Sequence, residues 1–186
     1  MDILKAMQER RSVRRYRTDP VPEEILFEVL EAARQAPSWA NTQISRFIIV
    51  RDSETKKLLS DTLVSNNPSR NAVIEAPMVI CLVAKKGVSG SYKGQAVTDK
   101  GDWFMFDAGI AMEHLVLAAW NFGLGTCHVG YFDAKKAEAI LNIPEGYAIV
   151  EITPLGYFDT VPAATPRKPL QELIYLDHFG EPYKKK

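Results

Sequence analysis

The segment 102–122 predicts one long helix that is apolar on nearly all of its sides. Its large apolar side chains fall on every face of a helix: Trp103, Phe104, Met105, Phe106, Ile110, Met112, Leu115, Val116, Leu117 and Trp120. Asp107, Glu113 and His114 in its middle argue against a membrane span, because each would be costly in hydrocarbon. A helix of this kind must be covered on every side, which one small domain rarely achieves. We therefore expect part of it to lie in a homodimer interface.

The length and composition of the chain fit one globular domain spanning 1–186. The 186 residues are enough for one buried core and short for two, and 46% hydrophobic with 25% charged residues is ordinary for such a domain. Met1 is followed directly by Asp2 and a charged amphipathic segment, so we expect no signal peptide. Cys81 and Cys127 lie in apolar stretches without a CxxC partner or a metal-ligand spacing. We expect buried free thiols, a cytoplasmic location and no metal site.

The apolar periodicity predicts further helices and strands along the chain. Helices are expected at 2–10, 22–36, 53–63 and 133–141, and Pro22, Asp52 and Asp133 are suitable start residues. Strands are expected at 45–51, 78–84 and 148–157, and the segment 126–131 begins a strand or an extended turn. Strand 78–84 is apolar on both faces, which favours a central place in its sheet. We expect an exposed, mobile loop at 86–101 and a loop or weak helix at 64–70.

The segment 159–186 is a C-terminal arm rather than a free tail. Four of its side chains are too apolar for a segment that is fully exposed to solvent: Leu170, Leu173, Ile174 and Tyr175. We expect the arm to wrap over a neighbouring surface, plausibly that of a partner chain.

Five arginines fall within eight residues near the start of the chain, in the run RRSVRRYR at 10–17. A guanidinium group matches phosphate geometry and stays charged, so the run is a candidate receptor for a phosphorylated small molecule. A second interpretation is a solvated surface or ion pairs with Glu9 and Asp19. Nucleic acid is a poor candidate partner, because 23 basic residues against 23 acidic ones do not supply a broad basic face.

Three more motifs accompany this run. They are APSWANTQ at 36–43, GLGTCHVGYFD at 123–133, and PLGY at 154–157 followed ten residues later by Arg167-Lys168-Pro169-Leu170. In this order, with an apolar helix directly before the third motif, the chain resembles the FMN-dependent nitroreductase family over essentially its whole length. The resemblance implies an α+β sandwich around a mostly antiparallel central sheet flanked by helices. It also implies an intertwined homodimer with FMN at the subunit interface.

The resemblance implies roles for the residues that match the motifs. Arg10 and Ser12 would hold the FMN phosphate and ribityl chain, Arg11 would support the same end, and Arg14 would lie near flavin N1 and O2. Arg167 and Lys168 would close on the phosphate, and Asn67 would reach the pyrimidine end of the ring. The backbone of His128, Val129 and Gly130 would face flavin N5 and O4. Residues from the partner subunit would line the opposite side: Pro37, Ser38, Trp39 and Asn41.

Most of these residues have a structural alternative. Ser38 and Asn41 could only satisfy their own backbone, and Trp39 could pack in an interface without touching a ligand. His128 could be a satisfied core histidine whose backbone matters more than its imidazole. Because reduced flavin tends to be anionic at N1, a guanidinium at Arg14 would stabilise that form.

The activity implied is oxidation of NAD(P)H and reduction of a nitroaromatic, quinone or related acceptor by a ping-pong mechanism. The flavin carries this chemistry, so no side-chain acid or base is named. The chain has no Rossmann fingerprint, so the nicotinamide would dock directly over the flavin. Two alternatives stay open: a flavin-binding storage or electron-transfer protein, and a specialised dehalogenase or flavin-fragmenting relative. The segment 86–101 is short where larger members carry a lid, which predicts an open acceptor pocket.

Overall fold

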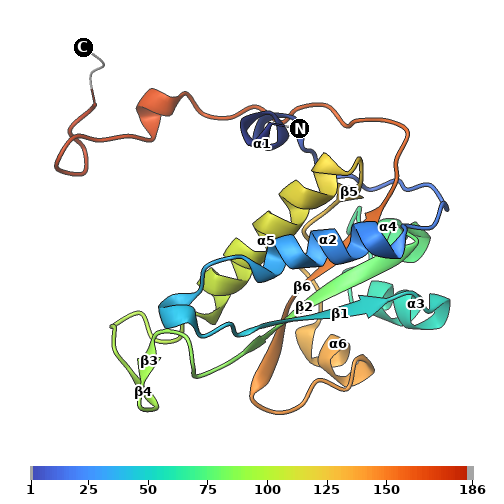
Figure 1. Cartoon of the computed structure of the whole chain (residues 1–186), viewed down its shortest axis with the longest axis horizontal. Coiled ribbons are helices and arrows are strands. Elements are labelled where there is room, and N and C mark those ends of the chain that lie inside the picture. The colour runs from blue at the N-terminus through green and yellow to red at the C-terminus, as the bar shows by residue number, and fades with distance from the viewer. Residues whose placement is uncertain (1, 184–186) are drawn as a thin grey trace.

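The computed structural model describes residues 2–183 as a layered α+β fold. Its main sheet has the strand order β1 (Ser45–Val50), β2 (Met78–Lys85), β6 (Tyr147–Gly156) and β5 (Gly125–Thr126). All three strand pairings are antiparallel. The antiparallel sheet and the three strands expected from the apolar runs are therefore confirmed. The predicted extended segment at 126–131 overlaps β5 and continues along β6 (Figure 1).

Strand β2 occupies the central position that its composition predicted, between β1 and β6. Its residues 78–84 are all buried. Ile80 and Leu82 belong to the core on one face of the sheet, and Cys81 belongs to the core on the other. This alternation follows from the two-residue period of a strand, and it requires helices on both faces.

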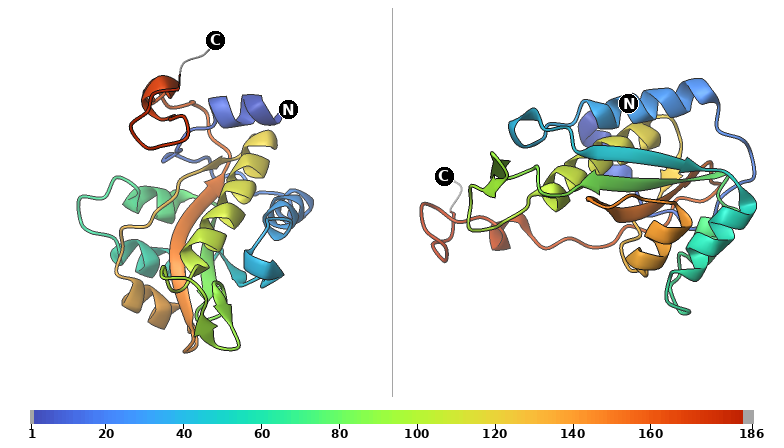
Figure 2. Two further views of the ribbon diagram at one scale, coloured as in Figure 1. Left: turned by 90° about the vertical axis from the view of Figure 1, so that its left-hand side faces the viewer. Right: turned by 90° about the horizontal axis from the view of Figure 1, so that it is seen from below.

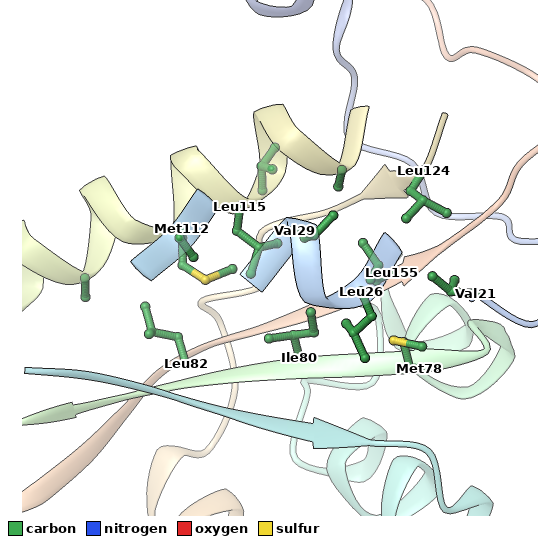
Figure 3. Packing of buried hydrophobic residues seen from close by; sticks show 14 residues of the cluster. Val21, Leu26, Val29, Met78, Ile80, Leu82, Met112, Leu115, Leu124 and Leu155 are labelled. Carbon is green, nitrogen blue, oxygen red and sulfur yellow. The ribbon is translucent and has the colours of Figure 1, made fainter. Parts of the chain in front are cut away.

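Helices α2 (Glu23–Arg34) and α5 (Phe104–Asn121) cover one face of the sheet. Figure 3 shows Leu26 and Val29 of α2 and Leu115 of α5 above Ile80 and Leu82 of β2. The other face is covered by α3 (Ser53–Asp61), α4 (Arg70–Glu75) and α6 (Ala134–Ile140) (Figure 2). The long helix is thus covered on its sheet side by the domain itself. Among residues 2–183, no helix is both long enough and apolar enough to cross a membrane.

The predicted start signals act as helix caps. The Asp52 side chain accepts the N–H of Thr55 at 2.7 Å ahead of α3, and that of Asp133 accepts the N–H of Lys136 at 3.1 Å ahead of α6. Pro22 precedes the first helical residue of α2. These bonds satisfy backbone donors that a helix start leaves without partners.

The segment 86–101 is largely exposed, as expected, but it is not an irregular loop throughout. This segment forms a small hairpin of β3 (Ser91–Tyr92) and β4 (Gln95–Ala96). Ser89 is fully buried, and its hydroxyl donates to the carboxylate of Asp107 in α5 at 2.7 Å. A polar anchor of this kind has no apolar pattern, so periodicity does not reveal it.

The segments that follow α1 and β6 lie beside β5. After α1 (Ile3–Glu9) the chain runs extended beside β5, where the N–H of Val13 donates to the carbonyl of Thr126 at 2.8 Å. A Cβ atom at Gly125 would lie 2.7 Å from Val13, so only glycine permits this approach. The segment after β6 passes over α1 and then leaves the body as an arm (Figure 1). The arm contains the short 3₁₀ helix η2 (Leu170–Glu172), and Phe179 on it is 92% exposed.

Candidate functional site

The arginine-rich segment and the start of the C-terminal arm line one groove of about 490 Å³. Four arginines lie on it, and none of the described residues that line it is Asp or Glu. The groove is lined by Met7, Gln8, Arg10, Arg11, Ser12, Arg14, Pro162, Ala163, Ala164, Thr165 and Arg167. Two basic segments far apart in the sequence therefore meet, as a phosphate site would require.

Two of these guanidinium groups, those of Arg11 and Arg167, form hydrogen bonds with backbone carbonyl oxygens and none with an Asp or Glu side chain in the described part of the chain. Arg11 Nη1 donates to the carbonyls of Gln8 at 2.7 Å and Arg10 at 2.8 Å. Its Nε is buried and has no hydrogen-bond partner. Arg167 is exposed, and its Nη1 donates to the carbonyl of Thr165 at 3.2 Å. A buried donor without a partner beside an electropositive groove is compatible with an anionic ligand.

Other arginines of the run do pair with acids, as the alternative interpretation expected. Arg17 donates to the carboxylate of Asp19 at 2.8 and 3.0 Å, outside the groove. Arg10 pairs with Glu113 of α5, with Nε 3.4 Å from Oε1, and not with the neighbouring Glu9. The run is therefore divided, and Arg10, Arg11 and Arg14 face the groove while Arg17 does not.

Arg14 links the groove to the segment 127–131. Its Nε donates to the hydroxyl of Ser69 at 3.2 Å, and that buried hydroxyl lies 3.7 Å from the Cys127 sulfur. Asn67 accepts the Ser69 N–H at 2.9 Å and donates to the carbonyl of Tyr131 at 3.4 Å. Asn67 thus lies beside the segment 127–131, and its contact with the pyrimidine end of a flavin ring stays a prediction. Sequence reasoning missed Ser69, whose role depends on this long-range contact.

The segment 127–130 is held against β6 by backbone pairing. The N–H of Val129 donates to the carbonyl of Ile152 at 3.2 Å, and the N–H of Ile152 donates back at 3.0 Å. Gly130 follows at the surface, and a Cβ atom there would meet nothing within 4 Å. The fold of this chain therefore does not itself require glycine at 130. The open space leaves room for a flat ligand to approach the backbone.

The His128 side chain is not a core histidine. Its Nδ1 lies 2.9 Å from Glu151 Oε1, and its Nε2 lies 3.6 Å from Glu113 Oε2. These carboxylates, Glu113 and Glu151, raise the pKa of His128 to about 10. His128 in turn holds the pKa of Glu113 below its usual range. The imidazole therefore carries a charge at neutral pH, a feature that the sequence did not predict.

The stability lost on removing this imidazolium is expected to depend on pH in a defined way. The pKa of His128 rises on folding from the ordinary 6.5 to about 10, so its contribution is complete below pH 6.5 and disappears as pH approaches 10. The lowered pKa of Glu113 adds a contribution that disappears as pH falls below its ordinary 4.5. The loss of unfolding free energy in His128→Gln is therefore expected to be largest between about pH 5 and 6.5.

Urea unfolding of the FMN-free protein between pH 5 and 10 measures this difference. His178→Gln, at an exposed position of the arm, serves as the control for the loss of a histidine. If the free energy of unfolding of His128→Gln, plotted against pH, runs parallel to that of the wild type from pH 6 to 10, the assigned charge of His128 is wrong.

The segment 36–43 lies at the other end of α5 from the arginine groove, near the first helical turn (Figure 1). The N–H of Trp39 donates to Asp107 at 3.1 Å, and the Trp39 ring lies 5.1 Å from that of Trp103. The Ser38 hydroxyl accepts the N–H of Gln43 at 2.9 Å. Ser38 therefore bonds to the backbone of its own loop, which is the structural alternative to contact with a ligand. Three non-glycine residues here have left-handed backbones: Ala40 (φ 43°), Asn41 (φ 57°) and Gln43 (φ 49°).

The predicted site residues thus fall into two groups within one chain. The structure brings together the segments 10–14, 67–69, 127–131 and 162–167. It leaves Pro37 and Ser38 on a separate groove of about 140 Å³, with no lining residue in common with the arginine groove. Lys168 is exposed and does not line the arginine groove. A single ligand can contact both groups only if a second chain supplies one of them.

A further groove of about 1010 Å³ runs between α1, α2 and α5. Its lining is mostly apolar, and several of these side chains are more than half exposed: Ile3, Met7, Met105 and Phe106. The Phe106 ring lies 5.2 Å from Trp103, which contacts Trp39 in turn. Glu113, the partner of Arg10 and His128, also lines this groove. Both groups of site residues therefore adjoin one unpartnered apolar surface, which we call the apolar groove.

Comparison with known proteins agrees with this architecture. Residues 7–157 match the model of the Nitroreductase family. The chain is 31% identical to the NADH dehydrogenase of Thermus thermophilus, over 94% of this chain and 95% of that protein. It is 29% identical to the FMN reductase [NAD(P)H] of Bacillus subtilis, over 96% of this chain and 74% of that protein. The solved FMN-dependent nitroreductase of Clostridium difficile R20291 superposes with a TM-score of 0.78 at 25% identity, covering 95% and 99% of the two chains.

Proposed function

This chain belongs to the nitroreductase family, and on that premise we propose that it is an FMN-dependent oxidoreductase. It would use NAD(P)H to reduce a nitroaromatic, a quinone or a related acceptor in a ping-pong cycle. The observation that carries the proposal is the groove in which four arginines from two distant segments meet without an acidic lining residue among those described. The FMN reductase of Bacillus subtilis, whose name states both FMN and NAD(P)H, supports the choice of cofactor and donor. When bound, FMN supplies the hydride and electron transfer.

The arginine groove would bind the phosphate of FMN. It is lined by Arg10, Arg11, Ser12 and Arg167. The Nε of Arg11 is buried without a hydrogen-bond partner, and a small movement of this side chain would let it donate to the phosphate. A phosphate carries close to two negative charges, so several guanidinium groups are needed to offset its desolvation. Lys168 would add a further charge by reaching over the phosphate from the arm.

The ring of FMN would lie along the segments that Arg14 joins to the groove. Arg14 and Asn67 would contact the pyrimidine end, since Ser69 connects both side chains. The backbone of His128, Val129 and Gly130 would face N5 and O4, where open space above Gly130 permits close approach. The nicotinamide and the acceptor would use the same face of the ring in turn, because the chain has no separate dinucleotide-binding motif.

The apolar groove would be closed by a second copy of the chain. Its exposed Met105 and Phe106 form the kind of surface that monomeric proteins rarely leave open. A two-fold pairing along α5 would place the start of one α5 near the end of the other. Pro37, Ser38, Trp39 and Asn41 of one chain would then approach the arginine groove of its partner. The exposed apolar residues of the C-terminal arm would lie on the same partner.

The absorption spectrum of the purified protein tests this function directly. We expect bands of oxidised flavin, or their recovery on adding FMN to the colourless protein, and loss of those bands when NADH or NADPH is added. Steady-state oxidation of the nucleotide should then depend on a nitroaromatic or quinone acceptor. Bound FMN that neither nucleotide reduces would instead favour a flavin-storage or electron-transfer protein. Failure to bind FMN at all would overturn the proposal.

A further inference from the structure

Four charged side chains form a continuous line from the arginine groove to the segment 128–130. Arg10 Nε lies 3.4 Å from Glu113 Oε1, and Glu113 Oε2 lies 3.6 Å from His128 Nε2. His128 Nδ1 lies 2.9 Å from Glu151 Oε1, which also accepts a hydrogen bond from the hydroxyl of Thr153. We call Arg10, Glu113, His128 and Glu151 the charge cluster.

The geometry fixes the charge of the histidine. Each ring nitrogen of His128 faces a carboxylate oxygen, so both nitrogens must carry a proton for both contacts to be favourable. The Glu151 side chain is only 13% exposed, and a carboxylate in that position needs a counter-charge nearby. With His128 protonated, the cluster contains two positive and two negative groups. Without that proton, the cluster has a net charge of minus one.

The cluster joins two parts of the proposed FMN site. Arg10 lines the groove assigned to the phosphate, and the backbone of His128 belongs to the segment assigned to flavin N5 and O4. The reduced flavin that Arg14 was expected to stabilise bears one more negative charge than the oxidised form. Any net negative charge in the cluster would therefore oppose reduction, and the effect would be appreciable in a partly buried site.

We propose that the imidazolium of His128 keeps the charge cluster neutral and thereby favours the reduced form of FMN at the adjoining site. His128 acts here through its charge and is a positioning residue rather than a catalytic one. The inference rests on the proposed flavin function. It does not concern the phosphate or the ring contacts themselves, so it can fail while FMN binding and reduction are both confirmed.

A set of charge variants separates this role from simple packing. The cluster has a net charge of zero in the wild type, minus one in His128→Gln, plus one in Glu113→Gln, and zero again in the variant with both substitutions. The midpoint potential of bound FMN is measured against a reference dye, after equal elution volumes confirm that the variants assemble alike. Glu54→Gln, on the exposed first turn of α3, is the control for loss of one carboxylate.

We expect His128→Gln to reduce the preference for reduced over oxidised FMN about tenfold, or ~30 mV for a two-electron couple. Glu113→Gln should raise the potential, the double variant should return close to the wild type, and Glu54→Gln should change nothing. A double variant no nearer to the wild type than His128→Gln would show that His128 acts by packing, and would overturn the inference. Equal potentials in all variants would overturn it too. If His128→Gln does not fold, the rise expected in Glu113→Gln decides alone.

A second measurement does not involve FMN. Nitrogen chemical shifts of His128 in the FMN-free protein should show a proton on both ring nitrogens at pH 8, where an isolated imidazole is neutral. A neutral His128 at pH 7 would overturn the inference. By contrast, a wild-type protein that binds no FMN, or whose FMN is not reduced by NAD(P)H, would refute the proposed function while leaving this charge state as found.

Discussion

Replacing both Arg11 and Arg167 by alanine is expected to weaken FMN binding by at least about 100-fold. A hydrogen bond to a charged group contributes about 1.5–3 kcal/mol, and two such bonds lost from a phosphate correspond to roughly two factors of ten at the lower bound. The two arginines come from opposite ends of the chain and line the same groove. Neither forms an ion pair with an acid in the described part of the structure, so their removal leaves no carboxylate unpaired.

Riboflavin makes this experiment specific for the phosphate. Dissociation constants of FMN and riboflavin are measured by quenching of flavin fluorescence as the FMN-free protein is added. The double variant should lose its preference for FMN while its affinity for riboflavin, which has no phosphate, stays the same. Lys57→Ala removes a positive charge from an exposed position of α3 and should leave both affinities unchanged.

Two outcomes of this experiment would contradict the assignment. An equal loss of affinity for FMN and riboflavin would mean that the arginines act on the ring or on the fold. No loss for either ligand would mean that the phosphate binds elsewhere. In the wild type, added salt should weaken FMN binding more than riboflavin binding, because the phosphate is attracted electrostatically.

The elements that the sequence predicted well are those specified by local chemistry. Strand β2 is a run of apolar residues that can only be buried on both faces, and Asp52 and Asp133 are capping residues with bonds of 2.7 and 3.1 Å. Helix α4 was missed because it has only six residues and no side-chain cap. Its C-terminal end depends on a distant residue instead, since Lys56 Nζ donates to the carbonyl of Ala76 at 2.6 Å.

The candidate site was predicted from motifs, and what the motifs omit is long-range. The groove could be anticipated because Arg11 and Arg167 lie within recognisable segments. Glu113 and Glu151 could not, because nothing in their own segments indicates that the fold places both beside His128. The same holds for the buried carboxylate of Asp107, which ties Trp39 to the hairpin through Ser89. A polar contact between distant elements leaves no periodic pattern in the sequence. It can be recognised only in the folded structure, where the two elements lie side by side.

Placing a carboxylate in the apolar groove is expected to separate the two chains of the proposed dimer. Ile110 lies in this groove beside Phe106 and Gly109, and it belongs to none of the buried core clusters, so Ile110→Glu should fold. Burying an unpaired carboxylate in an interface costs several kcal/mol, which corresponds to a loss of dimer affinity of about 100-fold or more. Light scattering coupled to size-exclusion chromatography measures the mass, and flavin absorbance of the same peak measures the bound FMN.

The FMN content decides whether the site is shared between chains. If Ser38 and Asn41 complete the site of the partner, the monomeric variant should lose FMN although every arginine of its groove is intact. Leu58→Glu places the same charge on α3 at a side chain that is 46% exposed and outside the groove, and it should leave both mass and flavin content unchanged. A variant that stays dimeric would show that the chains meet elsewhere. A monomer that retains FMN with wild-type affinity would show that one chain holds the cofactor alone, and that the segment 36–43 serves only its own fold.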